Sequence, residues 1–354
     1  MVILFHYFVL FTAPYSSVNL YPYHSKYANV LLFKQGYLGV QFFFIISGFV
    51  IFMTLQKCAS YKIFLVKRFA RLWPSLVACS VITFCLVRII DWKNEFPAFH
   101  QSIACFIPSL TISEPKLWSK LLNLKEVGYM DGSYWSLICE VKFYLIIGFL
   151  YFIDQTNFFR NWLIYVFIMV LAYIVVLKSS LYIPRELSDD IQYYFRLILF
   201  PEYLIFFTLG IYFFMLFNKD QIKTSTHMMI FLLLVSQLCF LQSINEDIFI
   251  VVFVLLFLTF LYKRNWLQFL TIRLVSTIGL ISYPLYLLHQ HIGVTLIAKF
   301  GPFFNQSFSV LIVVPVIVFM LLLSALVNKT IEIPANAFLK RVILRQNAKR
   351  SKVL

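Results

Sequence analysis

Long apolar runs separated by short polar breaks dominate the chain. A run of roughly 20 residues spans a bilayer, and this spacing predicts about ten spans. Because helices satisfy every backbone polar group inside a membrane, we expect an all-α fold, a polytopic transmembrane helical bundle that forms one domain over residues 1–354. The predicted spans are 1–13, 36–55, 72–90, 134–153, 162–177, 194–217, 227–241, 248–262, 278–299 and 308–327.

Composition excludes an ordinary soluble domain. Hydrophobic residues make up 61% of the 354 and charged residues 13%, and the mean hydropathy is +0.85. The net charge of +15 would suit nucleic acid, but basic residues gather in alternate loops and in the tail 328–354. That pattern follows the positive-inside rule, so we expect a lipid bilayer and no nucleic acid as partner, with both termini and the basic tail cytoplasmic.

Two features carry weaker signals. The six cysteines have no paired spacing, so we expect small buried hydrophobes and no metal site. Residues 92–133 form one long external segment, and a loop of that length is uncommon unless it is functional or disordered. A lid or acceptor surface and a passive cap both remain open for it.

The stretch SYKIFLVKRFARLWP (60–74) predicts a short basic helix at the membrane surface, with Pro74 in the first turn of the next span. At about 100° per residue, Lys67, Arg68 and Arg71 fall within one arc and form a single cationic face. One interpretation is contact with anionic lipid head groups. The other is a clamp for a cytoplasmic phosphorylated ligand, because paired arginines bind phosphate through fixed forks of donors.

The stretch DGSYWSLICEVKFYL (131–145) places Ser136, Glu140 and Tyr144 on one helix face at four-residue spacing. An acid inside a span is costly and must meet a donor or a charge from another helix. A structural pairing and a catalytic role for Glu140 both remain open.

The stretch ISYPLYLLHQHIG (281–293) brings polar groups to membrane depth, among them Tyr283, His289 and His291. The two histidines are two residues apart on opposing faces, so they are not a helical metal pair. At about 1.5 Å per residue, His6, Glu140 and His289 lie at similar depths near the membrane centre. That convergence favours a shared polar cavity.

Taken in order, these segments resemble the membrane acyltransferase-3 family. The resemblance runs from His6 to Pro334 and is carried by FHYF, GYLGVQFFFIISGFVI, KRFARLWP, WSLICEVKFYL, ISYPLYLLHQHIG and IEIP. The family acylates, most often O-acetylates, extracytoplasmic glycans such as O-antigen, capsule or exopolysaccharide. Carried over by residue, the resemblance implies catalytic roles for His6, Glu140 and His289 and donor binding by Arg68 and Arg71. From their positions on the helices, we add Lys67 to the donor-binding set and expect Ser136, Tyr144 and Tyr283 to be supporting polar residues.

The start of the chain departs from the family pattern. The family's first helix usually has an arginine eleven residues before its histidine, whereas His6 is the sixth residue here. We therefore expect either a natural start upstream or a truncated first helix.

The expected function is a multi-pass inner-membrane O-acyltransferase with no permanently bound cofactor. Acetyl-CoA or another acyl-CoA would be the donor substrate, and a glycan or lipid-linked sugar the acceptor. A neutral imidazole at His6 suits a general base or an acyl carrier. A transporter or flippase of a lipid-linked sugar is the alternative from another class, and a glycan polymerase is a third.

Overall fold

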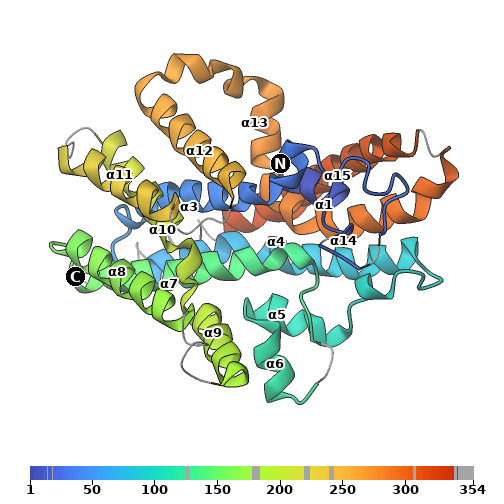
Figure 1. The fold of residues 1–354 in the computed structure, drawn as a ribbon, viewed down its shortest axis with the longest axis horizontal. Coiled ribbons are helices and arrows are strands. Elements are labelled where there is room, and N and C mark those ends of the chain that lie inside the picture. Colours follow the sequence, from blue (N-terminus) through green and yellow to red (C-terminus); the bar gives the residue numbers. More distant parts are fainter. Residues whose placement is uncertain are drawn as a thin grey trace. The chain divides into compact units, whose positions relative to one another are not determined.

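The computed structural model describes residues 1–13, 15–17, 19–124, 127–177, 184–218, 224–238, 243–305, 308–338 and 341. Within these residues every regular element is helical, which confirms the all-α prediction (Figure 1). The basic tail was predicted over 328–354, and most of it, 339–340 and 342–354, lies outside the described residues, as does Cys239. The α-helices are α1 (Val2–Phe8), α2 (Leu31–Lys34), α3 (Gly39–Leu55), α4 (Tyr61–Ile90), α5 (Phe106–Thr111), α6 (Pro115–Leu121), α7 (Trp135–Ile153), α8 (Phe158–Leu177), α9 (Arg185–Leu199), α10 (Pro201–Phe217), α11 (Thr224–Leu238), α12 (Ile244–Tyr262), α13 (Arg273–Leu280), α14 (Ser282–Phe300) and α15 (Val313–Val327).

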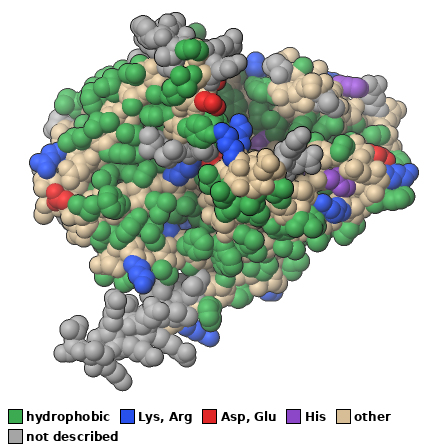
Figure 2. Space-filling model, turned by 90° about the horizontal axis from the view of Figure 1, so that it is seen from below, with side chains coloured by type: hydrophobic (Ala, Val, Ile, Leu, Met, Phe, Trp, Pro, Cys, Tyr) green, Lys and Arg blue, Asp and Glu red, His purple; other side chains and the backbone are tan. Residues whose placement is uncertain are grey.

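Six stretches of the described chain are long and apolar enough to cross a membrane. Two further apolar helices, Pro201–Phe217 and Ser225–Leu238, are shorter, so the predicted count of about ten spans is not confirmed. Broad areas of apolar side chains cover the face drawn in Figure 2, and a smaller number of charged side chains are scattered among them. The six stretches are Gly36–Leu55, Tyr61–Ile90, Gly132–Ile153, Phe158–Val176, Ile244–Tyr262 and Ser309–Phe338.

Three helix boundaries correct the sequence prediction. The stretch at 60–74 is not a separate surface helix, because α4 continues unbroken through Pro74. The predicted span 194–217 is divided at Phe200, whose φ of 39° is left-handed and separates α9 from α10. The first predicted span, 1–13, is helical only over Val2–Phe8, after which the backbone leaves the helix at Val9 with φ −126°.

The chain forms two compact units, each built from separated segments. The first unit comprises 1–37, 66–137 and 269–354, and the second comprises 38–65 and 138–268. The long helices α4 and α7 each contribute residues to both units. The prediction of a single functional domain remains a prediction.

In the second unit, α3 packs directly on α10 through small residues (Figure 1). A Cβ atom at Gly48 would lie 2.1 Å from the Phe207 carbonyl oxygen, and one at Gly210 would lie 2.1 Å from the Ile45 carbonyl oxygen. Glycines at these two positions therefore let the backbones approach closely, as in other tightly packed membrane helices.

In the first unit, α14 is the central helix, packed against α1 and α15. Most of its residues from Pro284 to Ala298 are buried, including His289, Gln290 and His291. Because buried polar groups need hydrogen-bond partners, this helix is where the polar contacts of the unit concentrate.

Candidate active site

A pair of histidines joins α1 to α14. The Nδ1 atom of His6 lies 2.7 Å from the Nε2 atom of His289, although the two residues are 283 positions apart. The two rings are nearly parallel, with an angle of 7° between their planes. His289 is fully buried and His6 is half-buried. Two of the three predicted catalytic residues therefore lie in direct contact.

The tautomers of this pair follow from a backbone carbonyl. The Nδ1 atom of His289 lies 2.7 Å from the carbonyl oxygen of Tyr286, which can only accept, so His289 Nδ1 carries the proton. Burial favours neutral rings, and a neutral His289 then has an unprotonated Nε2 that accepts from His6 Nδ1. This assignment places the lone pair of His6 on Nε2, to which no hydrogen bond is made within the described part of the chain.

Side chains at the start of α7 hold that carbonyl in place. Ser133 Oγ lies 3.0 Å from the Tyr286 carbonyl oxygen and 2.7 Å from Asp131 Oδ1, and its one proton is available to either acceptor. The Tyr286 hydroxyl lies 2.7 Å from Ser136 Oγ and 3.1 Å from the Ser133 carbonyl oxygen. Ser136 is thus linked to the histidine pair through Tyr286, and its supporting role stays a prediction. Tyr286 and Ser133 were missed as site residues, although Tyr286 precedes His289 by one helical turn.

His291 belongs to a separate, structural set of contacts. Its Nδ1 meets the Met130 carbonyl at 3.1 Å, and its Nε2 accepts from the Gly132 backbone at 3.3 Å. The buried Asp131 carboxylate accepts from the His291 backbone N–H at 2.8 Å and from Ser133. These bonds fasten the segment before α7 to α14. Within the described residues, no group of three or more histidine, cysteine, aspartate or glutamate side chains lies close enough to hold a metal ion.

The chain around His6 is fixed by tyrosine hydroxyls. Tyr21 donates to the His6 carbonyl and Tyr23 to the Tyr7 carbonyl, while Tyr7 donates to the His289 carbonyl at 2.9 Å. Burial raises the pKa of Tyr21 and of Tyr23, so both remain neutral donors. The last carbonyls of α1 are satisfied by side chains, which explains how so short a helix ends here.

Tyr283 is an anchor at the other end of α14. Its hydroxyl donates to the Leu72 carbonyl of α4 at 2.8 Å. The contact joins two helices of the first unit, and the supporting role of Tyr283 at the site stays a prediction.

Glu140 lies in the second unit, where Ser47 Oγ of α3 donates to its Oε1 at 3.0 Å. One turn further on, Tyr144 is buried and its ring contacts Phe64. The predicted meeting of Glu140 with the two histidines stays a prediction. A donor from another helix does meet this acid, as its burial requires.

The three cations of α4 differ in exposure. Arg68 is 4% exposed and buried, whereas Lys67 and Arg71 are exposed. The prediction of one uniform cationic face is therefore wrong, because Arg68 is covered by protein. The Arg71 charge acts on the Glu332 carboxylate of the one-turn π-helix Asn328–Glu332, within the first unit.

Comparison with known proteins decides the family. The model of an acyltransferase domain, acyltransferase-3, matches residues 1–329. The chain belongs to the acyltransferase-3 family. It is also 32% identical over 117 residues to an O-acetyl transferase of Shigella phage Sf6, an alignment that covers 32% of this chain and 34% of the phage protein. The chain thus aligns with about a third of the length of this curated relative, and no solved structure matches.

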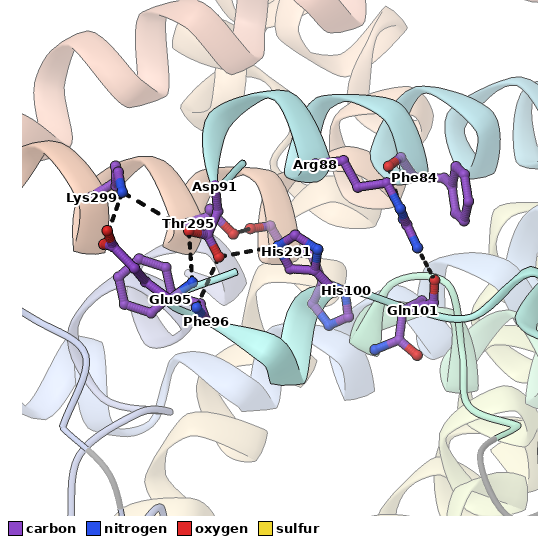
Figure 3. Close-up of polar contacts among 10 residues, drawn as sticks. All are labelled: Phe84, Arg88, Asp91, Glu95, Phe96, His100, Gln101, His291, Thr295 and Lys299. Atoms are coloured by element: carbon purple, nitrogen blue, oxygen red, sulfur yellow. Dashed lines mark hydrogen bonds and ion pairs between the residues drawn. The ribbon is translucent and has the colours of Figure 1, made fainter. Parts of the chain in front are cut away.

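This acyltransferase-3 chain also has an ordered charged cluster where α4 ends, drawn in Figure 3. The fully buried Asp91 carboxylate accepts from the Glu95 and Phe96 backbone at 3.0 and 2.8 Å and contacts His100 Nε2 at 3.0 Å. Lys299 of α14 lies 2.8 Å from Glu95 and 4.0 Å from Asp91. Burial alone would raise the pKa of Asp91, but these hydrogen bonds lower it below its ordinary value. Residues 92–133, the segment predicted to be a lid, an acceptor surface or a passive cap, are therefore held against α14 at their start by these contacts.

Proposed function

We propose that this membrane protein transfers an acetyl or short acyl group from cytoplasmic acyl-CoA to a sugar hydroxyl of an extracytoplasmic glycan. The carrying observation is the hydrogen bond between His6 and His289, found in a chain matched by the acyltransferase-3 model over residues 1–329. The O-acetyl transferase name of the phage relative supports oxygen as the acceptor atom. An inner-membrane location with both termini cytoplasmic belongs to the same proposal.

His6 Nε2 is the proposed general base. It takes the proton of the acceptor hydroxyl as the oxygen attacks the thioester carbon, and the C–S bond breaks as the C–O bond forms. The proton then passes from His6 to the departing thiolate of coenzyme A. While His6 is protonated, His289 Nε2 accepts a charge-assisted hydrogen bond from Nδ1, which stabilises the imidazolium.

The cations of α4 are the proposed donor site. Arg71 is exposed on this helix and offers a planar fork of donors to the phosphates of coenzyme A. Lys67 is exposed four residues earlier, on the same side of the helix. Arg68 is buried beside them, so its charge would attract the phosphates across intervening protein atoms and not by direct contact at the surface.

Radiolabelled acetyl-CoA tests the proposal. Membranes containing the protein are incubated with the donor and with the envelope glycan of the organism that encodes the chain. We expect label in the glycan for the wild type, and none above background for His6→Ala at equal protein level. Translocation of a lipid-linked sugar without acetylation would instead identify a transporter or flippase, and changed glycan chain length a polymerase.

A further inference from the structure

Gln290 is a buried polar side chain that the reaction described above leaves unused. It lies on α14 between His289 and His291 and is 7% exposed. No hydrogen bond joins its amide nitrogen or amide oxygen to the described part of the chain, and neither atom is among the fully enclosed polar atoms, so the amide group is accessible although the residue is mostly buried. Buried carboxamides are normally bonded, so an unpartnered one next to a reactive pair needs an explanation.

The backbone opposite Gln290 leaves room for this carboxamide. A Cβ atom at Gly132 would lie 2.3 Å from Gln290 Nε2 and 2.9 Å from Oε1. Every residue other than glycine at position 132 would therefore displace the amide. Gly132 is itself fixed by its bond to His291, so the amide cannot gain room by a free movement of this loop.

Helix geometry places Gln290 on the same side of α14 as the reactive pair. At about 100° per residue, Tyr286 lies between His289 and Gln290 around the helix axis, and the three occupy an arc of about 100°. Gln290 therefore lies about 40° around the axis from Tyr286, whose hydroxyl meets Ser136, and about 100° from His289, whose Nε2 meets His6.

We propose that the Gln290 carboxamide binds two hydroxyl groups of the acceptor sugar next to the hydroxyl that is acylated. This inference rests on the proposed function. The amide lacks both a donor for its oxygen and an acceptor for its nitrogen, so its ligand must donate and accept. Neighbouring sugar hydroxyls do both, whereas the carbonyl oxygen of a thioester only accepts. The residue would therefore select the acceptor and take no part in bond making.

The variant Gln290→Met tests this assignment, because methionine keeps the length of the side chain and removes both hydrogen-bonding groups. Thr295→Val is the matched control: Thr295 is buried on another face of α14 and donates only to the His291 carbonyl. Rates are measured with acetyl-CoA and either the envelope glycan or a panel of methyl glycosides with their monodeoxy analogues.

For Gln290→Met we expect the acceptor KM to rise by roughly tenfold, since two neutral hydrogen bonds are lost, while kcat and the KM for acetyl-CoA stay within about twofold. The wild type should discriminate against the deoxy sugar that lacks a bound hydroxyl, and the variant should not. Thr295→Val should match the wild type.

The inference is overturned if kcat falls with an unchanged acceptor KM, if the variant matches the wild type, or if Thr295→Val has the same effect. Should Gln290→Met fail to accumulate, Gln290→Asn keeps the amide on a shorter stem and must give the same rise in KM. A wild type that acetylates glycan in a His6-dependent way while Gln290→Met is normal refutes this inference alone. A wild type that transfers no label refutes the proposed function and this inference with it.

Discussion

Replacement of His289 by leucine tests the histidine pair directly. The change removes the acceptor that holds His6 Nδ1 at 2.7 Å and the donor to the Tyr286 carbonyl. The Ser133 hydroxyl, 3.0 Å away, can turn its proton to the carbonyl that His289 leaves, so the loss falls mainly on His6. A hydrogen bond to a group that becomes charged contributes about 1.5–3 kcal/mol. At about 1.4 kcal/mol per factor of ten, kcat should fall by about 10- to 150-fold, with both KM values little changed.

The variant His289→Gln separates acceptor loss from volume change. A glutamine amide oxygen reaches the region of the imidazole Nε2 atom and can accept from His6, so we expect it to recover about tenfold over His289→Leu. Initial rates of label transfer from acetyl-CoA provide the assay, normalised to protein that melts at the wild-type temperature in detergent. Groups that act as one unit are not additive, so His6→Ala with His289→Leu should be no slower than His6→Ala alone.

Three results would refute this reasoning. One is an unchanged kcat for His289→Leu. Another is equal activity of the leucine and glutamine variants, which would mean that volume and not hydrogen bonding matters. The third is a double variant much slower than His6→Ala, because His289 would then act on the substrate independently of His6.

Further predictions concern stability and donor binding. Gly48→Ala should destabilise the protein by about 2 kcal/mol because the new methyl group meets backbone, and Gly279→Ala, with open space around it, should be neutral or slightly stabilising in the same thermal melt. The bonded Asp91 carboxylate has a lowered pKa, so its stabilisation is present above about pH 4 and is lost as the pH falls through that lowered value. Hydrogen exchange of residues 92–100 should show this acid dependence in the wild type and not in Asp91→Asn. Arg71→Lys should raise the KM for acetyl-CoA several-fold without a change in melting temperature, whereas Arg68→Lys should lower the melting temperature, because Arg68 is buried.

The apolar pattern was a good guide where one helix stands alone as a continuous run. Span 36–55 was predicted with the bounds that the structure has, and span 134–153 begins two residues late. The pattern failed where a helix breaks without glycine or proline, and where a proline stands inside a helix without breaking it. Phe200 adopts a left-handed φ without being glycine, and Pro74 is accommodated inside α4 although proline usually marks a helix start.

For the candidate site, too, some features were predictable from the sequence and others were not. His6 and His289 do lie together, but the depth estimate assumed a helix over 1–13, whereas α1 ends at Phe8. The contact therefore does not follow from rise per residue alone. Exposure was not predictable: neighbouring Arg68 and Arg71 share a helix and a charge, yet only Arg68 is covered by protein. The role of Tyr286 was also hidden, since its contribution to His289 is a backbone carbonyl and has no signature in side-chain type.

That carbonyl has a consequence for how the pair operates in a membrane. A carboxylate would orient His289 equally well, but an unpaired buried charge is costly in the resting enzyme. A carbonyl oxygen fixes the same tautomer while the relay from Tyr286 through His289 to His6 stays neutral. In the proposed reaction, positive charge arises only when His6 accepts a proton, and it is met by a lone pair of His289 already aimed at Nδ1. The His289 acceptor is in place before the reaction, but it stabilises His6 most when His6 is protonated. Such an interaction lowers the barrier without strengthening substrate binding.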